Sequence, residues 1–239
     1  MDMRGFCLSS DFPEKGVGWL TIEKPEIRNP YDAILEPVAV CPCTSDVHSA
    51  RANIGDGGAA SNLILGKTGQ KRPNIVLGHE AVGRIVEVGE LVADFKVGDI
   101  VAVPCVTPNW LTSEIQDGWY MHSGGQAGGR FTSLRDHGVF GEFLRIPFAD
   151  MNLARIPEGV SLAAGVLATD MITTGFSAVE MTDVQYGDTV VVIGIGPVGL
   201  MSVAGAALRG AGRIIAIGDR PICRRLAMEY GAEKVFSYK

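Results

Sequence analysis

The first part of the chain, up to about residue 157, alternates apolar and polar side chains over short stretches. This period of two occurs at residues 19–24, 81–88, 99–103 and 139–146, and glycine or proline separates the stretches. Alternation at this period is typical of strands that bury one face. Many short strands between turns predict an antiparallel barrel domain over residues 1–157.

The last third, residues 158–239, shows a different pattern. Continuous apolar runs at 189–193 and 213–217 predict strands buried on both faces, as in parallel sheets. We expect a helix over 161–181, with Ser161 as its cap.

Further helices are predicted at 197–209 and 221–230, and a short strand at 234–237. The resulting β-α-β-α-β order is the first half of a Rossmann cofactor-binding domain. The fold class is therefore α/β with a β-rich N-terminal part. Residues 55–71, rich in small residues, predict a long exposed loop between the first strands.

Composition narrows the classes of protein that this chain can represent. It has 239 residues, of which 46% are hydrophobic, so it can bury a core. A net charge of −6 argues against a nucleic-acid partner. No apolar run is expected to reach membrane-spanning length. The five scattered cysteines predict reduced thiols in a cytoplasmic protein.

A glycine-rich motif between the first parallel strand and its helix predicts a dinucleotide site. It fits the pattern G-x-G-x-x-G with Gly194, Ile195, Gly196, Pro197, Val198 and Gly199. The glycines allow a tight turn, a close approach of the pyrophosphate and close packing of the helix on the strand. The helix N-terminus then faces the phosphate charge.

The residues after the second parallel strand, Gly218, Asp219 and Arg220, bear on the choice of coenzyme. A carboxylate at this place accepts hydrogen bonds from ribose hydroxyls and favours NAD, whereas an arginine favours NADP. Because the sequence supplies both, this feature leaves the coenzyme open.

Four residues that are distant in sequence offer a set of metal ligands: Cys43, His79, Glu80 and Asp170. Three protein ligands and one open position describe a catalytic zinc site. From spacing alone, the favoured interpretation of His79 is a partly buried imidazole with satisfied hydrogen bonds and no metal.

A series of motifs recurs here in one order: PCTSDVH (42–48), LGHEAVG (77–83), TPNW (107–110), ADMNLA (149–154), TDM (169–171) and VIGIGPVGLM (192–201). Together they closely resemble the zinc-dependent medium-chain alcohol dehydrogenases, and among these the NADP-dependent secondary alcohol (isopropanol) dehydrogenases. The resemblance covers nearly the whole chain except the 55–71 loop. It implies that the barrel over residues 1–157 is GroES-like and that an incomplete Rossmann domain follows it.

The resemblance implies roles for individual residues. Cys43, His79 and Asp170 match the catalytic zinc ligands, and Glu80 matches a carboxylate that can enter or leave the zinc shell. Ser45 and His48 match a proton relay.

Further matches concern the substrate and the coenzyme. Trp110 matches a wall of the substrate pocket, and Gly218, Arg220 and Tyr238 match positions that select NADP. Asp219 departs from the pattern, since NADP-dependent members carry a small hydroxyl residue there, so NAD stays open. No structural-zinc cysteines are present, so one zinc ion is expected.

The implied reaction is hydride transfer between a small secondary alcohol and NADP, with a ketone or aldehyde as the reverse substrate. The implied assembly of the full-length protein is a homotetramer. Family members are considerably longer, and the chain stops inside the third parallel strand, so we expect it to be C-terminally truncated. The alternatives are a zinc-binding remnant without turnover, an NAD-dependent alcohol or polyol dehydrogenase, and a metal-free quinone or enone reductase.

Overall fold

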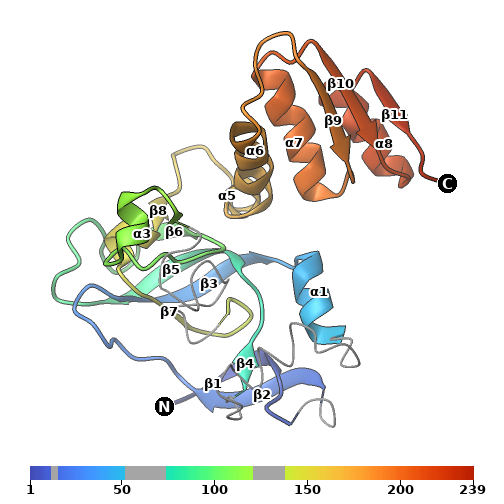
Figure 1. Cartoon of the computed structure of the whole chain (residues 1–239). Helices are drawn as coiled ribbons and strands as arrows, with labels where there is room; N and C mark the ends of the chain where they lie inside the picture. Colours follow the sequence, from blue (N-terminus) through green and yellow to red (C-terminus); the bar gives the residue numbers. More distant parts are fainter. Residues whose placement is uncertain (12–15, 52–73, 121–137) are drawn as a thin grey trace. The chain divides into compact units, whose positions relative to one another are not determined.

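The structure is a computed structural model, and it describes residues 1–11, 16–51, 74–120 and 138–239 (Figure 1). The expected loop at 55–71 lies outside these residues. By its internal contacts the chain forms two compact units, Met1–Val166 and Leu167–Lys239. The division at residue 157 that the sequence suggests stays a prediction.

The first unit contains a five-stranded antiparallel sheet with the order β7-β3-β5-β6-β8. Its strands are β3 (Ala33–Cys41), β5 (Glu80–Val88), β6 (Ile100–Val103), β7 (Leu144–Ile146) and β8 (Ala154–Arg155). The predicted strands at 81–88 and 99–103 correspond to β5 and β6. Fully buried aliphatic residues from β3, β5, β6 and β7 form the main core beside this sheet.

A second, three-stranded sheet has the order β2-β1-β4, from β1 (Asp2–Leu8), β2 (Val17–Glu23) and β4 (Ile75–Val76). Phe140 packs against the main core and also against the two smaller apolar clusters beside this sheet. One side chain therefore joins the cores of both sheets. Short helices α1 (Thr44–Arg51), α3 (Ser113–Gln116) and α4 (Ala149–Asn152) lie between the strands.

The strand predicted over 139–146 is wrong in its first half. Only Leu144–Ile146 pairs as a strand, whereas the backbone of residues 138–140 is bonded to residues 76–78. The side-chain period is the same in both halves, so the sequence pattern does not separate them. β3, which carries Pro37 and two register shifts, was not predicted from the sequence.

A buried ion pair fastens the turn before β3 to β7. Arg145 donates a hydrogen bond of 2.7 Å to Asp32 Oδ2, and the Asp32 side chain is fully buried. The same oxygen accepts the backbone N–H groups of Arg28 and Asn29. Burial of a charge without such partners would be costly, so this network fixes the start of β3.

The second unit contains a parallel sheet with the order β11-β10-β9, from β9 (Thr189–Ile193), β10 (Arg213–Ile217) and β11 (Lys234–Phe236). Helix α7 (Pro197–Leu208) links β9 to β10, and α8 (Pro221–Glu229) links β10 to β11 (Figure 1). Val203, Ala206, Ile214 and Ala216 form the centre of its core. The predicted β-α-β-α-β order is confirmed.

The prediction that β9 is buried on both faces is wrong for the described chain. Val190 and Val192 pack against the core, but Val191 and Ile193 are 52% and 81% exposed. The two connections, from β9 to β10 and from β10 to β11, step in the same direction across the sheet. Right-handed connections therefore place α7 and α8 on the same face. Among the described residues nothing covers the other face of β9.

The single helix expected over 161–181 is also wrong. The structure has α5 (Leu162–Ala168) and α6 (Met171–Met181), with a break at Thr169 and Asp170. Ser161 caps α5 as predicted, since its Oγ accepts the N–H of Ala164 at 3.2 Å. Asp170 precedes α6 with non-helical φ and ψ of −142° and −75°, which ends the first helix.

The segment Leu162–Met181 also corrects the expectation that no apolar run reaches membrane-spanning length. Its 20 residues have a mean hydropathy of 1.4, enough by length and composition for one span. This is weak evidence, because the core helix of a globular unit passes the same test. The break at Asp170 also interrupts the helix within the segment.

Candidate metal centre

Cys43 lies in the turn where β3 ends and α1 begins. Its N–H donates to Asp46 Oδ2 at 2.9 Å, and its carbonyl accepts the N–H of Asp46 at 3.1 Å. This reciprocal bonding resembles a capping box, in which an acidic side chain three residues on satisfies the cap N–H. The cap fixes the backbone of Cys43 and thereby the direction of its thiol.

His79 lies in the turn between β4 and β5, and two contacts fix this turn. Gly78 has a φ of +88°, and a Cβ atom there would lie 2.6 Å from the Phe140 ring. The carbonyls of Gly78 and Leu77 accept the N–H groups of Val139 and Phe140 at 3.0 and 2.9 Å. The backbone around His79 is therefore set by residues 60 positions further along the chain.

Asp46 connects the two turns. Its Oδ1 accepts the Gly78 N–H at 3.2 Å and lies 3.2 Å from His79 Nδ1. A carboxylate on Nδ1 holds the proton at that nitrogen and makes Nε2 the metal-binding nitrogen. Our sequence reasoning missed this role, although the position of an aspartate three residues after Cys43 was a usable signal.

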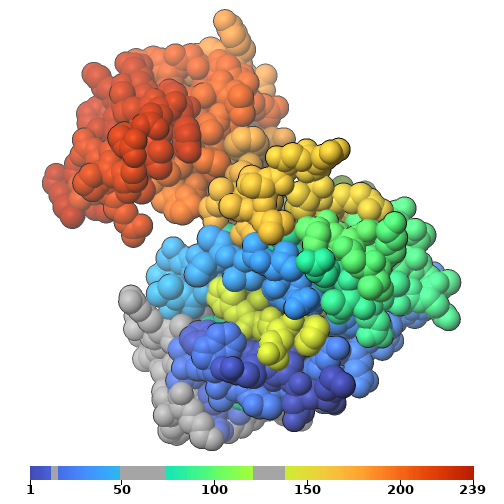
Figure 2. Space-filling model, turned by 180° about the vertical axis from the view of Figure 1, so that it is seen from behind, coloured from blue at the N-terminus to red at the C-terminus, as the bar shows by residue number. Residues whose placement is uncertain are grey.

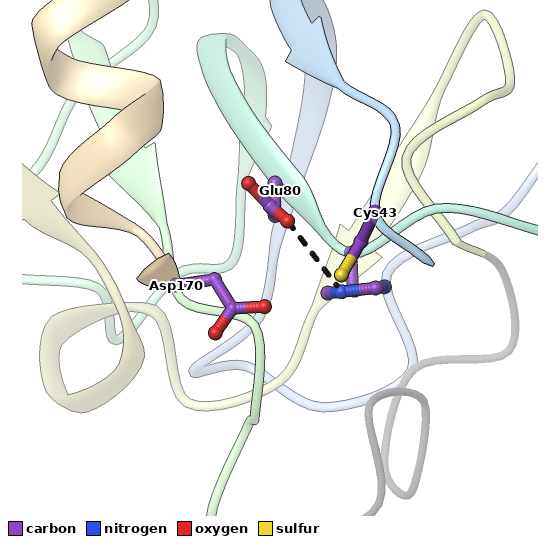
Figure 3. A group of neighbouring side chains, drawn as sticks. Cys43, Glu80 and Asp170 are labelled. Atoms are coloured by element: carbon purple, nitrogen blue, oxygen red, sulfur yellow. Dashed lines mark ion pairs between the residues drawn. The ribbon is translucent and has the colours of Figure 1, made fainter. Parts of the chain in front are cut away.

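Cys43, His79 and Glu80 come together inside the first unit. One ligand atom of each lies within 4.8 Å of the others, and His79 and Glu80 are almost fully buried. Figure 3 shows Cys43 and Glu80 beside the imidazole, with a dashed line for the 3.8 Å approach of Glu80 Oε1 to His79 Nε2. A thiol, an imidazole and a carboxylate at this spacing can share one metal ion.

The donor types in this group suit zinc. Thiolate sulfur and imidazole nitrogen are ligands that Zn²⁺ prefers, whereas Mg²⁺ and Ca²⁺ prefer oxygen. A thiolate and a carboxylate together would balance the charge of a divalent ion. The donor atoms of Cys43, His79 and Glu80 are therefore suitable ligands for a zinc ion.

Asp170, the fourth predicted residue, belongs to the second unit and stands immediately before α6. Thr174 Oγ1 donates to its Oδ1 at 2.6 Å, and Thr173 Oγ1 donates to its carbonyl at 2.8 Å. These bonds orient the Asp170 carboxylate relative to its own helix. Figure 3 shows the Asp170 carboxylate at the start of this helix.

The two predicted relay residues lie on α1. Ser45 Oγ is 3.5 Å from His79 Nε2, so it borders the group of ligand atoms. His48 lies one turn further along the helix and is exposed to solvent. Cys41, at the end of β3, is not one of the residues whose ligand atoms lie within 4.8 Å of one another. Burial, followed by the charge of Glu80, raises the pKa of its thiol.

Trp110 is held by Asn152, a residue for which the sequence predicted no role. The indole N–H donates to Asn152 Oδ1 at 3.0 Å, and the Asn152 amide donates to the carbonyls of Pro108 and Pro147. Asn152 is 4% exposed, and the Tyr120 ring lies 5.8 Å from the Trp110 ring. The orientation of the indole is thus fixed from α4.

The glycine turn of the second unit has the predicted local structure. Gly194 has a φ of +90°, and Gly196 caps α7 with Pro197 as its first residue. A Cβ atom on Gly199 would lie 1.8 Å from the Gly194 carbonyl oxygen, so only glycine allows this close packing. A Cβ atom on Gly196 would meet no atom within 4 Å, which leaves room beside the helix N-terminus.

The predicted coenzyme-selecting residues lie where β10 and β11 end. Gly218 is buried, and a Cβ atom there would lie 2.1 Å from the Ile195 side chain, so packing alone requires glycine. Arg220 and Tyr238 are exposed. Asp219 contacts Ser237 and Lys239.

Comparison with known proteins finds relatives that match nearly the whole chain. The chain is 51% identical over 238 residues to a protein named NADP-dependent isopropanol dehydrogenase from Thermoanaerobacter brockii, covering 99% of this chain and 62% of that protein. It is 48% identical to a protein of the same name from Entamoeba histolytica, covering 93% of this chain and 57% of that protein.

A solved structure, zinc dependent alcohol dehydrogenase 2 from Streptococcus pneumonia in its apo form, matches with a TM-score of 0.80 and 29% identity. That match covers 98% of this chain and 61% of the other. The family model of the alcohol dehydrogenase GroES-like domain matches residues 29–158. The chain therefore belongs to the family of proteins with the alcohol dehydrogenase GroES-like domain.

The relatives are longer than this chain, which spans about 62% of the Thermoanaerobacter brockii protein. The expectation that members of the family are considerably longer is thus confirmed.

Proposed function

We propose that the protein is a zinc-dependent oxidoreductase that transfers a hydride between a small secondary alcohol and NADP⁺, and reduces a ketone or aldehyde in reverse. The observation that carries this proposal is the group of Cys43, His79 and Glu80, with Asp46 holding Nδ1 of the imidazole. The names of the relatives support the same reaction.

In the proposed site Cys43, His79 and Asp170 are the zinc ligands, and Glu80 is a carboxylate that can enter or leave the zinc shell. A zinc ion bound there would polarise the oxygen of a bound alcohol and lower its pKa. The thiol of Cys43 and the imidazole of His79 come from turns that Asp46 bonds to each other. These hydrogen bonds hold the two turns together and so support the positions of both ligands.

Side chains of the protein carry out the proton transfer and form the alcohol pocket. Ser45 Oγ accepts the hydroxyl proton of the alcohol and at the same time gives up its own proton toward His48. His48, exposed on the same helix, releases a proton to solvent. Trp110, fixed by Asn152, forms a wall of the alcohol pocket. Its orientation would limit the size of the groups on the carbinol carbon.

The coenzyme is proposed to bind at the glycine turn between β9 and α7, with residues 194–199 around its pyrophosphate. The room beside Gly196 and the N-terminus of α7 suit a phosphate group. Gly218, Asp219, Arg220 and Tyr238 are proposed to surround the adenosine ribose. We further propose a cytoplasmic homotetramer for the full-length protein, without nucleic-acid or membrane partners.

The metal part of this proposal is tested by native mass spectrometry of the purified chain, with Cys43→Ser and Cys41→Ser as a matched pair. We expect one zinc ion per chain in the wild type and in Cys41→Ser, and none in Cys43→Ser. Circular dichroism of each sample shows that it is folded. A folded wild-type chain without zinc would contradict the metal assignment.

Turnover is tested separately, by reduction of NADP⁺ in the presence of 2-propanol. Activity that depends on Cys43 supports the proposed reaction. Because the chain spans only about 62% of its relative, a zinc-loaded chain without turnover would instead support the zinc-binding remnant. Turnover with NAD⁺ but not with NADP⁺ would support an NAD-dependent dehydrogenase.

A further inference from the structure

The carboxyl ends of β10 and β11 bring two short segments together at one edge of the second sheet. The strands are parallel, with Ile217 opposite Phe236, and the Gly218 N–H donates to the Phe236 carbonyl at 2.9 Å. The residues that follow each strand therefore lie side by side (Figure 1). Figure 2 shows the C-terminal residues, in red, at the surface of this unit.

Asp219 is the acidic residue at this edge, and both of its oxygens are engaged. Ser237 Oγ donates to Oδ1 at 2.6 Å, and Lys239 Nζ lies 2.7 Å from Oδ2. The Lys239 N–H also donates to Ser237 Oγ at 3.1 Å, which ties the three residues into one network. The hydrogen bonds from Lys239 and Ser237 lower the pKa of Asp219, and Asp219 raises the pKa of Lys239.

This network changes how the Asp219 carboxylate can interact with a bound nucleotide. A carboxylate near the end of the second strand of a dinucleotide fold accepts hydrogen bonds from the ribose hydroxyls and repels a 2′-phosphate. Here the carboxylate already accepts from a lysine and a serine. Its charge is matched by Lys239, so the field that would repel a phosphate is largely cancelled.

Two more cations lie near the same edge. Arg220 caps α8 and is exposed, and the positive charge of Arg224 also lowers the pKa of Asp219. Three cationic side chains, Arg220, Arg224 and Lys239, thus accompany one carboxylate. The net charge is positive, and guanidinium groups bind phosphate through paired hydrogen bonds.

We propose that Lys239 is a specificity-determining residue that pairs with Asp219 and so makes this edge a site for the 2′-phosphate of NADP rather than for the bare ribose of NAD. The proposal rests on the proposed function, because it presupposes the nucleotide site at the glycine turn. It explains how a carboxylate can stand where the resembling dehydrogenases carry a small hydroxyl residue.

The test measures binding of two small probes by isothermal titration calorimetry with the whole 239-residue chain. The probes are adenosine 2′,5′-bisphosphate and AMP, which differ only in the 2′-phosphate. The variants are Lys239→Met, Asp219→Ser and the double variant. Lys234→Met is the matched control, because Lys234 stands at the opposite end of β11.

In the wild type we expect the bisphosphate to bind at least about tenfold more tightly than AMP. Lys239→Met should weaken bisphosphate binding by about tenfold and change AMP binding little, because Asp219 is left uncompensated. The double variant should regain the lost affinity, since no carboxylate then remains to be neutralised. Lys234→Met should bind both probes as the wild type does.

The failures are distinguishable. A wild type that binds neither probe overturns the nucleotide site itself, and this inference with it. Bisphosphate binding that survives Lys239→Met overturns the inference alone. A double variant that stays as weak as Lys239→Met also overturns it, because Lys239 would then contact the phosphate directly instead of neutralising Asp219.

Discussion

Cys43, His79 and Glu80 in the first unit lie among buried backbone turns, whereas Asp219, Ser237 and Lys239 in the second unit lie on an exposed edge. The first group is assembled from segments that are more than 30 residues apart, through Asp46 and the backbone of residues 138–140, which is bonded to residues 76–78. The second group follows from the pairing of two adjacent strands. We therefore expect that substitutions of buried polar groups strongly change the stability of the first unit. In the second unit, we expect substitutions at the exposed strand ends to change nucleotide binding more than stability.

The largest expected effect contrasts a buried ion pair with an exposed one. Arg145→Ala should cost about 3–5 kcal/mol, because it leaves the buried Asp32 carboxylate without its cation. Arg213→Ala, which removes the exposed pair with Glu233, should leave the stability unchanged within error.

Denaturant unfolding can follow the two units separately. All three tryptophans, Trp19, Trp110 and Trp119, belong to the first unit, so their fluorescence reports on it. Among the residues that the structure describes, the longest helices are α6, α7 and α8 of the second unit, so the helical circular dichroism signal is used to follow that unit. Equal effects of the two arginine variants would remove the proposed contrast between the units.

The next prediction compares alanine substitutions at two glycines of the same turn. Gly199→Ala should destabilise the second unit by about 3 kcal/mol, since its methyl group would collide with the Gly194 carbonyl. Gly196→Ala meets no atom of the protein, so the unit should melt as the wild type does. Its methyl group should nevertheless weaken NADP⁺ binding by on the order of tenfold, because it fills the place of the pyrophosphate.

Thermal melts by circular dichroism and titration calorimetry with NADP⁺ measure these two effects. If Gly196→Ala binds NADP⁺ like the wild type, the glycine turn is not the pyrophosphate site. If Gly199→Ala melts unchanged, the close packing of α7 on the turn is not required.

A smaller effect concerns the metal group. Asp46→Asn should lower zinc affinity by about 10- to 100-fold, because an amide holds the Nδ1 proton of His79 less strongly. Asp150→Asn is the control, since Asp150 also accepts two backbone N–H groups in the first unit but lies outside the metal group. Competition with a chromophoric chelator measures the affinity, and similar values for both variants would argue against the role of Asp46.

The smallest effect is a pH dependence in the first unit. Burial raises the pKa of Cys7 from 9.0 to about 11, and its neutral thiol donates to the Gly5 carbonyl. The unfolded chain ionises at lower pH, so stability falls as pH rises from about 9 and levels off above about 11.

At pH 10 the loss relative to pH 8 should be about 1 kcal/mol. Cys7→Ala should remove this part of the decline, which tryptophan fluorescence during urea unfolding at both pH values can show. An identical decline in wild type and variant would mean that another group causes it.

The sequence predicted the local parts of the second unit well. The strands at 189–193 and 213–217, the proline-led helices and the glycine turn all depend on neighbours in the chain, so period and residue type reveal them. The break at Asp170 escaped prediction, because an apolar run continues on both sides of it. The exposure of Val191 and Ile193 also escaped, since an apolar run does not tell which faces are covered.

In the first unit the sequence alone determined which residues are chemically able to bind a metal ion. Cys43, His79 and Glu80 are recognisable by their type and by the motifs around them. Only the tertiary structure decided that Asp46 bonds both turns, that residues 138–140 hold the backbone of His79, and that Asn152 fixes Trp110. These contacts join segments far apart in the chain, and their geometry depends on how the sheets pack, which no local pattern encodes.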